Sequence, residues 1–194
     1  MKKYNKIVLT GASGRLGSYL REPLSKISKN LLNIVSLILG GPTKYYSFSN
    51  EELIQVFRKI KSNFISQGHK VLVIPSMRTP KRIIDLAMKE FVKEGFVVNT
   101  VDKQAYLSAL ALAANIVVTC DSTSMISEAT ASGKPIFVAH MKPKKNNYRF
   151  KKFFRLFKEM GITRDLGEQV ESWTYNKLNE ATRIAALINN KLKN

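Results

Sequence analysis

Short apolar runs alternate with amphipathic segments along this chain, and this alternation limits the possible folds more than any other feature. The apolar runs are Lys6–Thr10, Asn33–Leu39, Val71–Ile74, Phe96–Val101, Ile116–Cys120 and Pro135–Ala139. The segments with helical periodicity are Leu16–Ile27, Ser49–Gln67, Pro80–Gly95, Ala105–Ala114, Asp121–Ser132 and two at the end, 149–160 and 177–192. Alternation of this kind indicates βαβ units. The sequence therefore predicts an α/β fold, with a doubly wound, mostly parallel Rossmann-like sheet that carries helices on both faces.

The length and composition limit the number of domains and the compartment. A chain of 194 residues holds one substantial core, and we divide it into an N-terminal βα segment, 1–29, and a nucleotide-binding domain, 30–194. No apolar run is long enough to span a membrane, and the apolar part of the N-terminus is too short for a signal peptide. A single cysteine fits a reducing compartment. We therefore expect a cytoplasmic protein. The two histidines, His69 and His140, are far apart, so no metal site is predicted.

A hydroxyl-rich turn, Asp121-Ser-Thr-Ser-Met-Ile-Ser-Glu128, follows the strand predicted at Ile116–Cys120 and opens a helix. In parallel sheets ligands bind beyond the carboxyl ends of the strands, and the first turn of a helix offers unpaired N–H groups to an anion. The turn therefore predicts a phosphate site made by Asp121, Ser122, Thr123, Ser124 and Met125. Glu128 lies one turn further along, where a carboxylate can accept hydrogen bonds from a ribose diol. The alternative is an ordinary helix cap at Asp121 or Ser122.

Two other loops carry distinctive residues after predicted strands. Gly40 and Gly41 end the run Asn33–Leu39, and paired glycines permit a positive φ and close approach of the backbone to a ligand. The stretch Ser76-Met-Arg78-Thr79-Pro80 follows Val71–Ile74, and its arginine presents a planar fork that suits phosphate. A plain turn and a surface arginine are the alternatives. Because all three loops follow strands of one predicted parallel sheet, we expect them to form one nucleotide site.

A fourth loop has the glycine spacing of a dinucleotide-binding motif, with Gly11, Gly14 and Gly17 after the strand predicted at Lys6–Thr10. Such a motif is completed by an acidic residue about twenty residues further on, at the end of the second strand. No Asp or Glu occurs between Glu22 and Glu51. The loop is therefore a candidate for NAD(P) binding only under an alternative function, and no other cofactor is predicted.

The net charge of +18, from 32 basic and 14 acidic residues, favours an anionic partner. Nucleic acid is not favoured, because the chain has no RGG tract, zinc knuckle, RRM signature or helix-turn-helix pattern. Residues 142–158 contain eight basic residues and no acidic one, with phenylalanines at helical spacing. One interpretation is a helix that packs its phenylalanines on the sheet and leaves a solvated basic face. The other is docking at an anionic membrane, which would place the protein peripherally at the inner membrane face.

Four strings of the sequence resemble the elongated-mitochondria family, which comprises plant mitochondrial-fission proteins and their bacterial relatives. They are Leu39-Gly-Gly-Pro-Thr, Ser76-Met-Arg-Thr-Pro, Ala114-Asn-Ile-Val-Val-Thr-Cys-Asp-Ser-Thr-Ser-Met-Ile-Ser-Glu-Ala and Ser132-Gly-Lys-Pro-Ile-Phe-Val. The resemblance covers about residues 30–194. Bacterial members have carried the label of predicted nucleoside-diphosphate-sugar epimerase, although they look like glycosyltransferases of the GT-B fold.

The resemblance implies a nucleotide-diphosphate sugar as ligand and assigns roles to the loops. Gly40 and Gly41 would approach the donor, Ser76 and Arg78 would flank its diphosphate, the turn at 122–125 would cap it, and Glu128 would take the ribose hydroxyls. The family has an additional N-terminal α/β domain that usually supplies the acceptor side. We therefore expect a partner that supplies this domain if the chain acts as a transferase, and no catalytic residue is identified.

The N-terminal residues instead look like the opening of an NAD-dependent epimerase or uronate dehydrogenase, which supports an epimerase or dehydrogenase as the alternative function. Tyr148 and Lys152 also have the Tyr-x-x-x-Lys spacing of short-chain dehydrogenases, with Ser124 upstream. In that chemistry the tyrosine is the acid/base. We interpret this spacing as accidental, because the neighbouring strands do not resemble that family.

Overall fold

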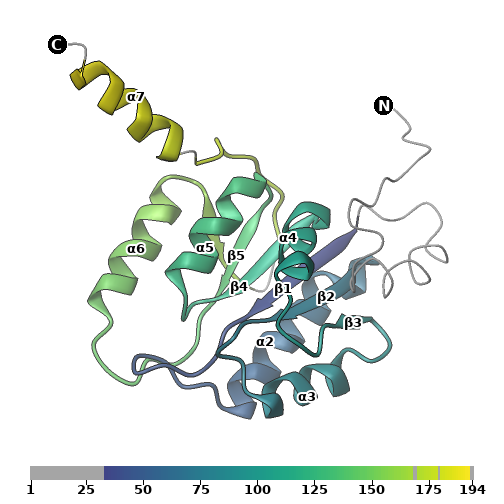
Figure 1. The fold of residues 1–194 in the computed structure, drawn as a ribbon. Coiled ribbons are helices and arrows are strands. Elements are labelled where there is room, and N and C mark those ends of the chain that lie inside the picture. Colours follow the sequence, from purple (N-terminus) through teal and green to yellow (C-terminus); the bar gives the residue numbers. More distant parts are fainter. Residues whose placement is uncertain (1–32, 168–169, 179, 193–194) are drawn as a thin grey trace, which may run out of the picture.

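The structure, a computed structural model, describes residues 33–167, 170–178 and 180–192. These residues form a six-stranded sheet in the order β3-β2-β1-β4-β5-β6, and every neighbouring pair is parallel (Figure 1). The strands are β1 (Ile34–Leu39), β2 (Lys70–Pro75), β3 (Gly95–Val97), β4 (Asn115–Thr119), β5 (Ile136–Ala139) and β6 (Thr163–Asp165). This order is that of the Rossmann fold, so the predicted fold class is confirmed.

The predicted strands agree with the structure except at the edges of the sheet. β3 begins at Gly95 and is shorter than the predicted run Phe96–Val101, because the chain soon leaves the sheet to begin the next helix after Asp102. β6 was not predicted, since Thr163–Asp165 has no apolar pattern and forms a strand only by pairing with β5. The predicted strand Lys6–Thr10 and helix Leu16–Ile27 lie outside the described residues, as does most of the proposed segment 1–29.

Helices cover both faces of the sheet (Figure 1). On one face lie α2 (Asn50–Asn63) and α3 (Lys81–Glu90), and on the other α4 (Lys103–Leu112), α5 (Thr123–Ala129) and α6 (Tyr148–Glu159). The remaining elements are two short 3-10 helices, η1 (Ile65–Gln67) and η2 (Thr130–Ser132), and a last helix, α7 (Glu180–Leu192), that lies apart from the sheet. α2 begins with a capping box in which the Ser49 hydroxyl accepts from Glu52 N and the Glu52 carboxylate accepts from Ser49 N.

The core is continuous through the sheet because its central strands are buried on both sides. All six residues of β1 are buried, and its one polar side chain, Ser36, donates to the carbonyl of Ala109 on α4 at 2.8 Å. On the α2 side, Phe57 packs edge-on against Phe91 with ring centroids 5.0 Å apart. No helix in the described ranges is both long and apolar enough to cross a membrane.

Candidate functional site

The candidate site lies where β1 and β4 run side by side at the centre of the sheet. The chain leaves β1 toward α2 on one face of the sheet and leaves β4 toward α5 on the other, so the two carboxyl ends form a topological switch point. In doubly wound sheets this topological switch point is where ligands bind. Gly40 follows β1 directly, and Asp121 lies two residues beyond the end of β4. The topology thus brings the predicted loops to one place.

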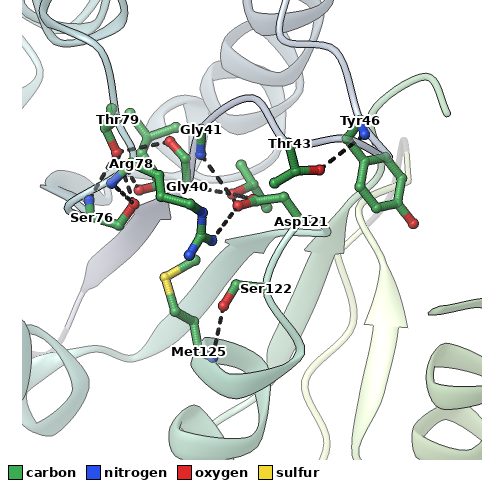
Figure 2. Close-up of polar contacts among 12 residues, drawn as sticks. Gly40, Gly41, Thr43, Tyr46, Ser76, Arg78, Thr79, Asp121, Ser122 and Met125 are labelled. Atoms are coloured by element: carbon green, nitrogen blue, oxygen red, sulfur yellow. Dashed lines mark hydrogen bonds and ion pairs between the residues drawn. The ribbon is translucent and has the colours of Figure 1, made fainter. Parts of the chain in front are cut away.

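Hydrogen bonds join the ends of β1 and β4 into one buried cluster (Figure 2). Gly40 N donates to Thr119 Oγ1 at 2.8 Å, and Thr119 Oγ1 donates to Asp121 Oδ1 at 2.7 Å. Gly41 N donates to Asp121 Oδ2 at 3.3 Å. The N–H groups of both glycines are therefore occupied by the protein itself. Thr119 was not among the predicted site residues, although a threonine at the end of an otherwise apolar strand was a usable signal.

Arg78 is held at this cluster by the carboxylate of Asp121. Its Nη2 lies 2.7 Å from Asp121 Oδ2, and the exposed fraction of the side chain is 46% for Arg78 and 0% for Asp121. A buried carboxylate needs a charged partner and hydrogen bonds to offset its lost hydration. Asp121 has both, and it fixes a guanidinium whose outer side remains open to solvent. Its carboxylate is not itself exposed to a ligand, so its contribution to a site passes through Arg78.

The turn between β2 and α3 brings Arg78 to this position. The Thr79 hydroxyl lies 2.8 Å from the carbonyl oxygens of both Leu39 and Gly40, and it accepts from Ser76 N at 2.9 Å. Pro80 then caps α3 with φ −64°. Ser76, Arg78 and Thr79 are therefore brought together with Gly40 and Gly41, as the three-loop prediction expects.

Gly40 and Gly41 are glycines because the three loops pack too closely for a side chain. A Cβ on Gly40 would lie 2.0 Å from Asp121 Oδ1, and a Cβ on Gly41 would lie 1.9 Å from the carbonyl oxygen of Arg78. Neither has a positive φ; the glycines that do, among the described residues, are Gly68, Gly133 and Gly161. The expected positive φ is therefore not found at Gly40 and Gly41, and their close approach is to other loops of the protein; approach to a ligand stays a prediction.

The first turn of α5 follows Asp121 directly at this switch point. Ser122 is its cap, and its hydroxyl accepts from Met125 N at 3.4 Å, while Met125 itself packs against the core. The cap interpretation is therefore correct for Ser122 rather than Asp121. Within the described part of the chain, the N–H groups of Thr123 and Ser124 have no partner, and the Ser124 side chain is exposed. Figure 2 shows the Arg78 side chain directed toward this turn, in which Ser122 and Met125 are labelled.

Glu128 lies on α5 outside this hydrogen-bonded cluster. It is exposed, and its Oε2 accepts from the hydroxyl of Tyr106 on α4 at 2.8 Å, while its Oε1 accepts no hydrogen bond from the described residues. Burial and the neighbouring Glu128 carboxylate raise the pKa of Tyr106 well above its usual value, so the hydroxyl stays protonated and keeps donating. Tyr106 was not predicted, because nothing in the sequence connects the two helices at this point.

A pocket of about 650 Å³ opens beside Thr123, between the loop after β1 and the loop after β5. It is lined by Tyr45, Thr123, Asn146, Asn147, Tyr148, Arg149, Phe150 and Phe153. Two bonds hold its walls together: Lys144 N donates to the Tyr45 carbonyl, and Asn147 Nδ2 donates to the Tyr46 hydroxyl, both at 2.8 Å. This pocket was not predicted, because its aromatic residues come from segments about a hundred positions apart.

Two buried groups near the pocket are unsuited to catalysis. Burial raises the pKa of the Cys120 thiol to about 12, so it is not a thiolate at neutral pH. Burial likewise raises the pKa of Tyr46 to about 12.

The other candidate residues are not joined into a site in the part of the chain that the structure describes. No hydrogen bond there joins Tyr148, of the short-chain-dehydrogenase spacing, to Ser124 or to Lys152. No group of three potential metal ligands occurs in the described ranges. Gly11, Gly14 and Gly17 lie outside them.

A family model described as mitochondrial fission ELM1 matches residues 7–192. Uncharacterized protein RP120 of Rickettsia prowazekii (strain Madrid E) is 31% identical over 179 residues, covering 88% of this chain and 50% of that protein. Mitochondrial fission protein ELM1 of Arabidopsis thaliana is 29% identical over 138 residues, covering 67% of this chain and 31% of that protein. The chain thus spans half or less of the length of these curated relatives.

A solved structure with the same fold is that of a putative UDP-N-acetylglucosamine 2-epimerase from Listeria monocytogenes. Its TM-score is 0.52 at 16% sequence identity, and the match covers 87% of this chain and 42% of that one. At this identity the likeness shows the fold alone. It agrees with the GT-B-like arrangement expected from the sequence.

Proposed function

Since this chain belongs to the mitochondrial fission ELM1 family, we propose that it binds a nucleoside diphosphate sugar at the switch point between the carboxyl ends of β1 and β4. The observation that carries this proposal is the guanidinium of Arg78, fixed by the buried carboxylate of Asp121 at the switch point of the sheet. A half-exposed guanidinium held in one place presents its remaining N–H groups to a diphosphate without losing further freedom on binding.

The neighbouring groups fit the remaining parts of such a ligand. The free N–H groups of Thr123 and Ser124 and the Ser124 hydroxyl supply donors for phosphate oxygens. Glu128 offers its Oε1 to the hydroxyls of a ribose, while Tyr106 donates to the other oxygen. The Listeria monocytogenes protein with this fold is named for a nucleotide-sugar substrate. Because that likeness extends to the fold only, the proposal for this chain rests on these residues.

Transfer of the sugar requires an acceptor site and a base in addition to donor binding. The one carboxylate within the hydrogen-bonded cluster, Asp121, is fully buried and already paired, so it is not a base for an incoming acceptor. We therefore assign the acceptor side to a second domain of the kind that the longer relatives have room for, either in the same polypeptide or in a partner. In this proposal the described domain is the donor-binding half of a glycosyltransferase.

The alternative of an NAD(P)-dependent epimerase or dehydrogenase stays a prediction, because its glycine loop lies outside the described residues. The family match begins at residue 7 and includes that loop. No contact in the described residues favours the alternative.

Isothermal titration with UDP-, GDP- and ADP-sugars tests the proposal directly. We expect one of them to bind with saturable heat, and absence of binding by all three at millimolar concentration would overturn the proposal. Glu128→Ala should weaken binding by about 1.5–3 kcal/mol, the value of a hydrogen bond to a charged group.

A matched pair of substitutions on α5 separates ligand binding from folding. Ser124→Asp adds a negative charge to the first turn, which favours the helix but repels a diphosphate, and should weaken binding by about 2 kcal/mol. Ser127→Asp adds the same charge to an exposed position further along the helix and should bind almost like the unchanged protein. Equal loss of affinity in both variants would contradict a diphosphate seat at the first turn.

A further inference from the structure

The eight basic residues of segment 142–158 are all exposed, and they form a surface that runs from the loop after β5 along the outside of α6. We call this the basic surface and define it as Lys142, Lys144, Lys145, Arg149, Lys151, Lys152, Arg155 and Lys158. In Figure 1, α6 is the outermost helix of its layer, so nothing in the described chain covers its outer side. The basic surface is therefore available to a partner.

The phenylalanines of α6 are used within the protein and do not contribute to this surface. Phe157 is buried, and the other three, Phe150, Phe153 and Phe154, pack against the core. Phe150 meets Tyr46 edge-on, with ring centroids 5.2 Å apart. The interpretation of a phenylalanine face on the sheet is thus correct, and it fixes which side of the helix faces outward.

The loop that leads into α6 is fixed by backbone contacts with the loop after β1. Tyr46 and Pro143 form an isolated antiparallel bridge, and Lys144 N donates to the Tyr45 carbonyl at 2.8 Å. The Glu52 carboxylate accepts from Lys142 N. These contacts fix the loop, and the packed phenylalanines fix the helix. The lysine and arginine side chains of both therefore extend from a fixed backbone.

Internal partners neutralise only part of this charge. Lys158 pairs with Asp165 at 2.6 Å, and Arg155 lies 3.8 Å from Glu159. Lys145 lies over the ring of Tyr45, and Lys144 donates to the Thr43 carbonyl. A carbonyl and an aromatic ring are not anions, so within residues 33–167, 170–178 and 180–192 six side chains of the surface have no anionic partner: Lys142, Lys144, Lys145, Arg149, Lys151 and Lys152. A cluster of cations without internal partners attracts anions from outside the protein.

Exposed apolar side chains among these cations indicate which anion. Tyr148 is 66% exposed, Leu156 49% and Met160 48%. The first two lie on α6 together with Arg149, Lys151 and Lys152, and Met160 follows the end of the helix. Tyrosine and aliphatic groups between lysines and arginines suit the headgroup region of a bilayer, where apolar atoms enter and cations meet anionic lipid. Phosphates of a nucleic acid give Leu156 and Met160 no comparable environment. We propose that the basic surface docks the protein onto an anionic lipid bilayer.

Co-sedimentation with vesicles tests this docking with the full chain. We expect binding to phosphatidylcholine vesicles that contain phosphatidylglycerol, little binding to phosphatidylcholine alone, and a decrease as salt is raised. Equal sedimentation with both kinds of vesicle, or with neither, would overturn the proposal. Binding to RNA or DNA in place of the anionic vesicles would overturn it as well.

Matched charge reversals locate the docking surface. Lys151→Glu with Lys152→Glu should weaken partition onto anionic vesicles more than about twentyfold, since each cation near such a surface contributes roughly fivefold. Lys89→Glu with Lys93→Glu removes the same charge from exposed positions around the end of α3 and should leave partition near that of the unchanged protein. An equal loss in both double variants would show that only net charge matters and would exclude this surface.

A third variant tests the apolar contribution separately. Leu156→Ser keeps every charge and should still weaken partition several-fold, with the difference persisting at high salt, where electrostatic attraction is screened. An unchanged partition for Leu156→Ser would argue that the surface attracts anions in general and would contradict insertion at a bilayer. Because Leu156 is half-exposed, the variant should keep its melting temperature, which serves as the control for folding.

Discussion

The carboxyl edge of the sheet and the basic surface differ in whether their charged side chains are buried and paired or exposed and unpaired. Between β1 and β4 one carboxylate, Asp121, is fully buried and matched by one guanidinium. On the basic surface eight cations are exposed, and six of them lack an anionic partner among the described residues. Charge that is compensated inside the protein contributes to a fixed geometry, whereas charge left at the surface is available to another molecule. Substitutions in the first region should therefore affect folding, and those in the second should affect binding alone.

The largest effect should come from a methyl group where the three loops meet. Gly41→Ala places a Cβ 1.9 Å from the carbonyl oxygen of Arg78, and since backbone cannot swing away, we expect a loss of about 3 kcal/mol in the free energy of unfolding. Urea denaturation measures it. Gly167→Ala is the control, because the nearest atom to its Cβ is 3.9 Å away. A Gly41→Ala protein as stable as this control would contradict the close packing of the loops.

A smaller effect should follow from removing the buried charge. Asp121→Asn keeps the shape of the side chain but loses the ion pair with Arg78, and we expect about 2 kcal/mol of destabilisation, less than for a fully buried pair because Arg78 remains hydrated. The same variant should lose affinity for nucleotide sugars, since Arg78 is no longer held. Titration calorimetry and urea denaturation on one preparation measure both. Unchanged stability would mean that the ion pair between Asp121 and Arg78 does not stabilise the fold.

A pH-dependent effect of under about 1 kcal/mol should come from Asp165, which pairs with part of the basic surface and is half-exposed. Burial raises the pKa of Asp165, but hydrogen bonds from Lys158 and His140 outweigh it and leave the pKa below the usual value. A lowered pKa in the folded state stabilises the protein above the ordinary aspartate pKa, and this stabilisation is lost as pH falls through the lowered value.

Asp165→Asn should therefore be slightly less stable than the unchanged protein at neutral pH, and the two should converge in acid. Urea midpoints measured from neutral pH down to about pH 3 check this, since the ordinary aspartate pKa lies near 3.9. A difference that stays constant across this range would mean that the effect of the substitution is not electrostatic.

The smallest effect on folding should come from the unpaired cations. Lys151→Ala with Lys152→Ala removes two exposed charges that have no anionic partner among the described residues, so the free energy of unfolding should change by less than about 0.5 kcal/mol. Thermal unfolding at low and high salt measures it. A destabilisation as large as that of Asp121→Asn would remove the contrast between the two regions.

The sequence predicts the central strands of this fold because their apolar runs need no tertiary information. It does not predict β6, since Thr163, Arg164 and Asp165 form a strand only because β5 lies beside them. In the candidate site, position after a strand suffices to bring Gly40, Arg78 and Asp121 together. Sequence cannot say that the Asp121 carboxylate turns inward, because this depends on Thr119 and Gly41 being within reach. The hydrogen bond from Tyr106 to Glu128 joins two helices, so local sequence patterns do not predict it either.

The backbone contacts between the loops after β1 and β5 lower the conformational entropy that the protein loses when a ligand binds. Loops that become ordered only on binding lose conformational entropy at that moment, which weakens affinity. Here the bridge between Tyr46 and Pro143 and the bond from Lys144 N to the Tyr45 carbonyl order both walls of the pocket during folding. A ligand that enters beside Thr123 therefore restricts a few exposed side chains, such as Tyr148, and leaves the chain entropy of the loops unchanged.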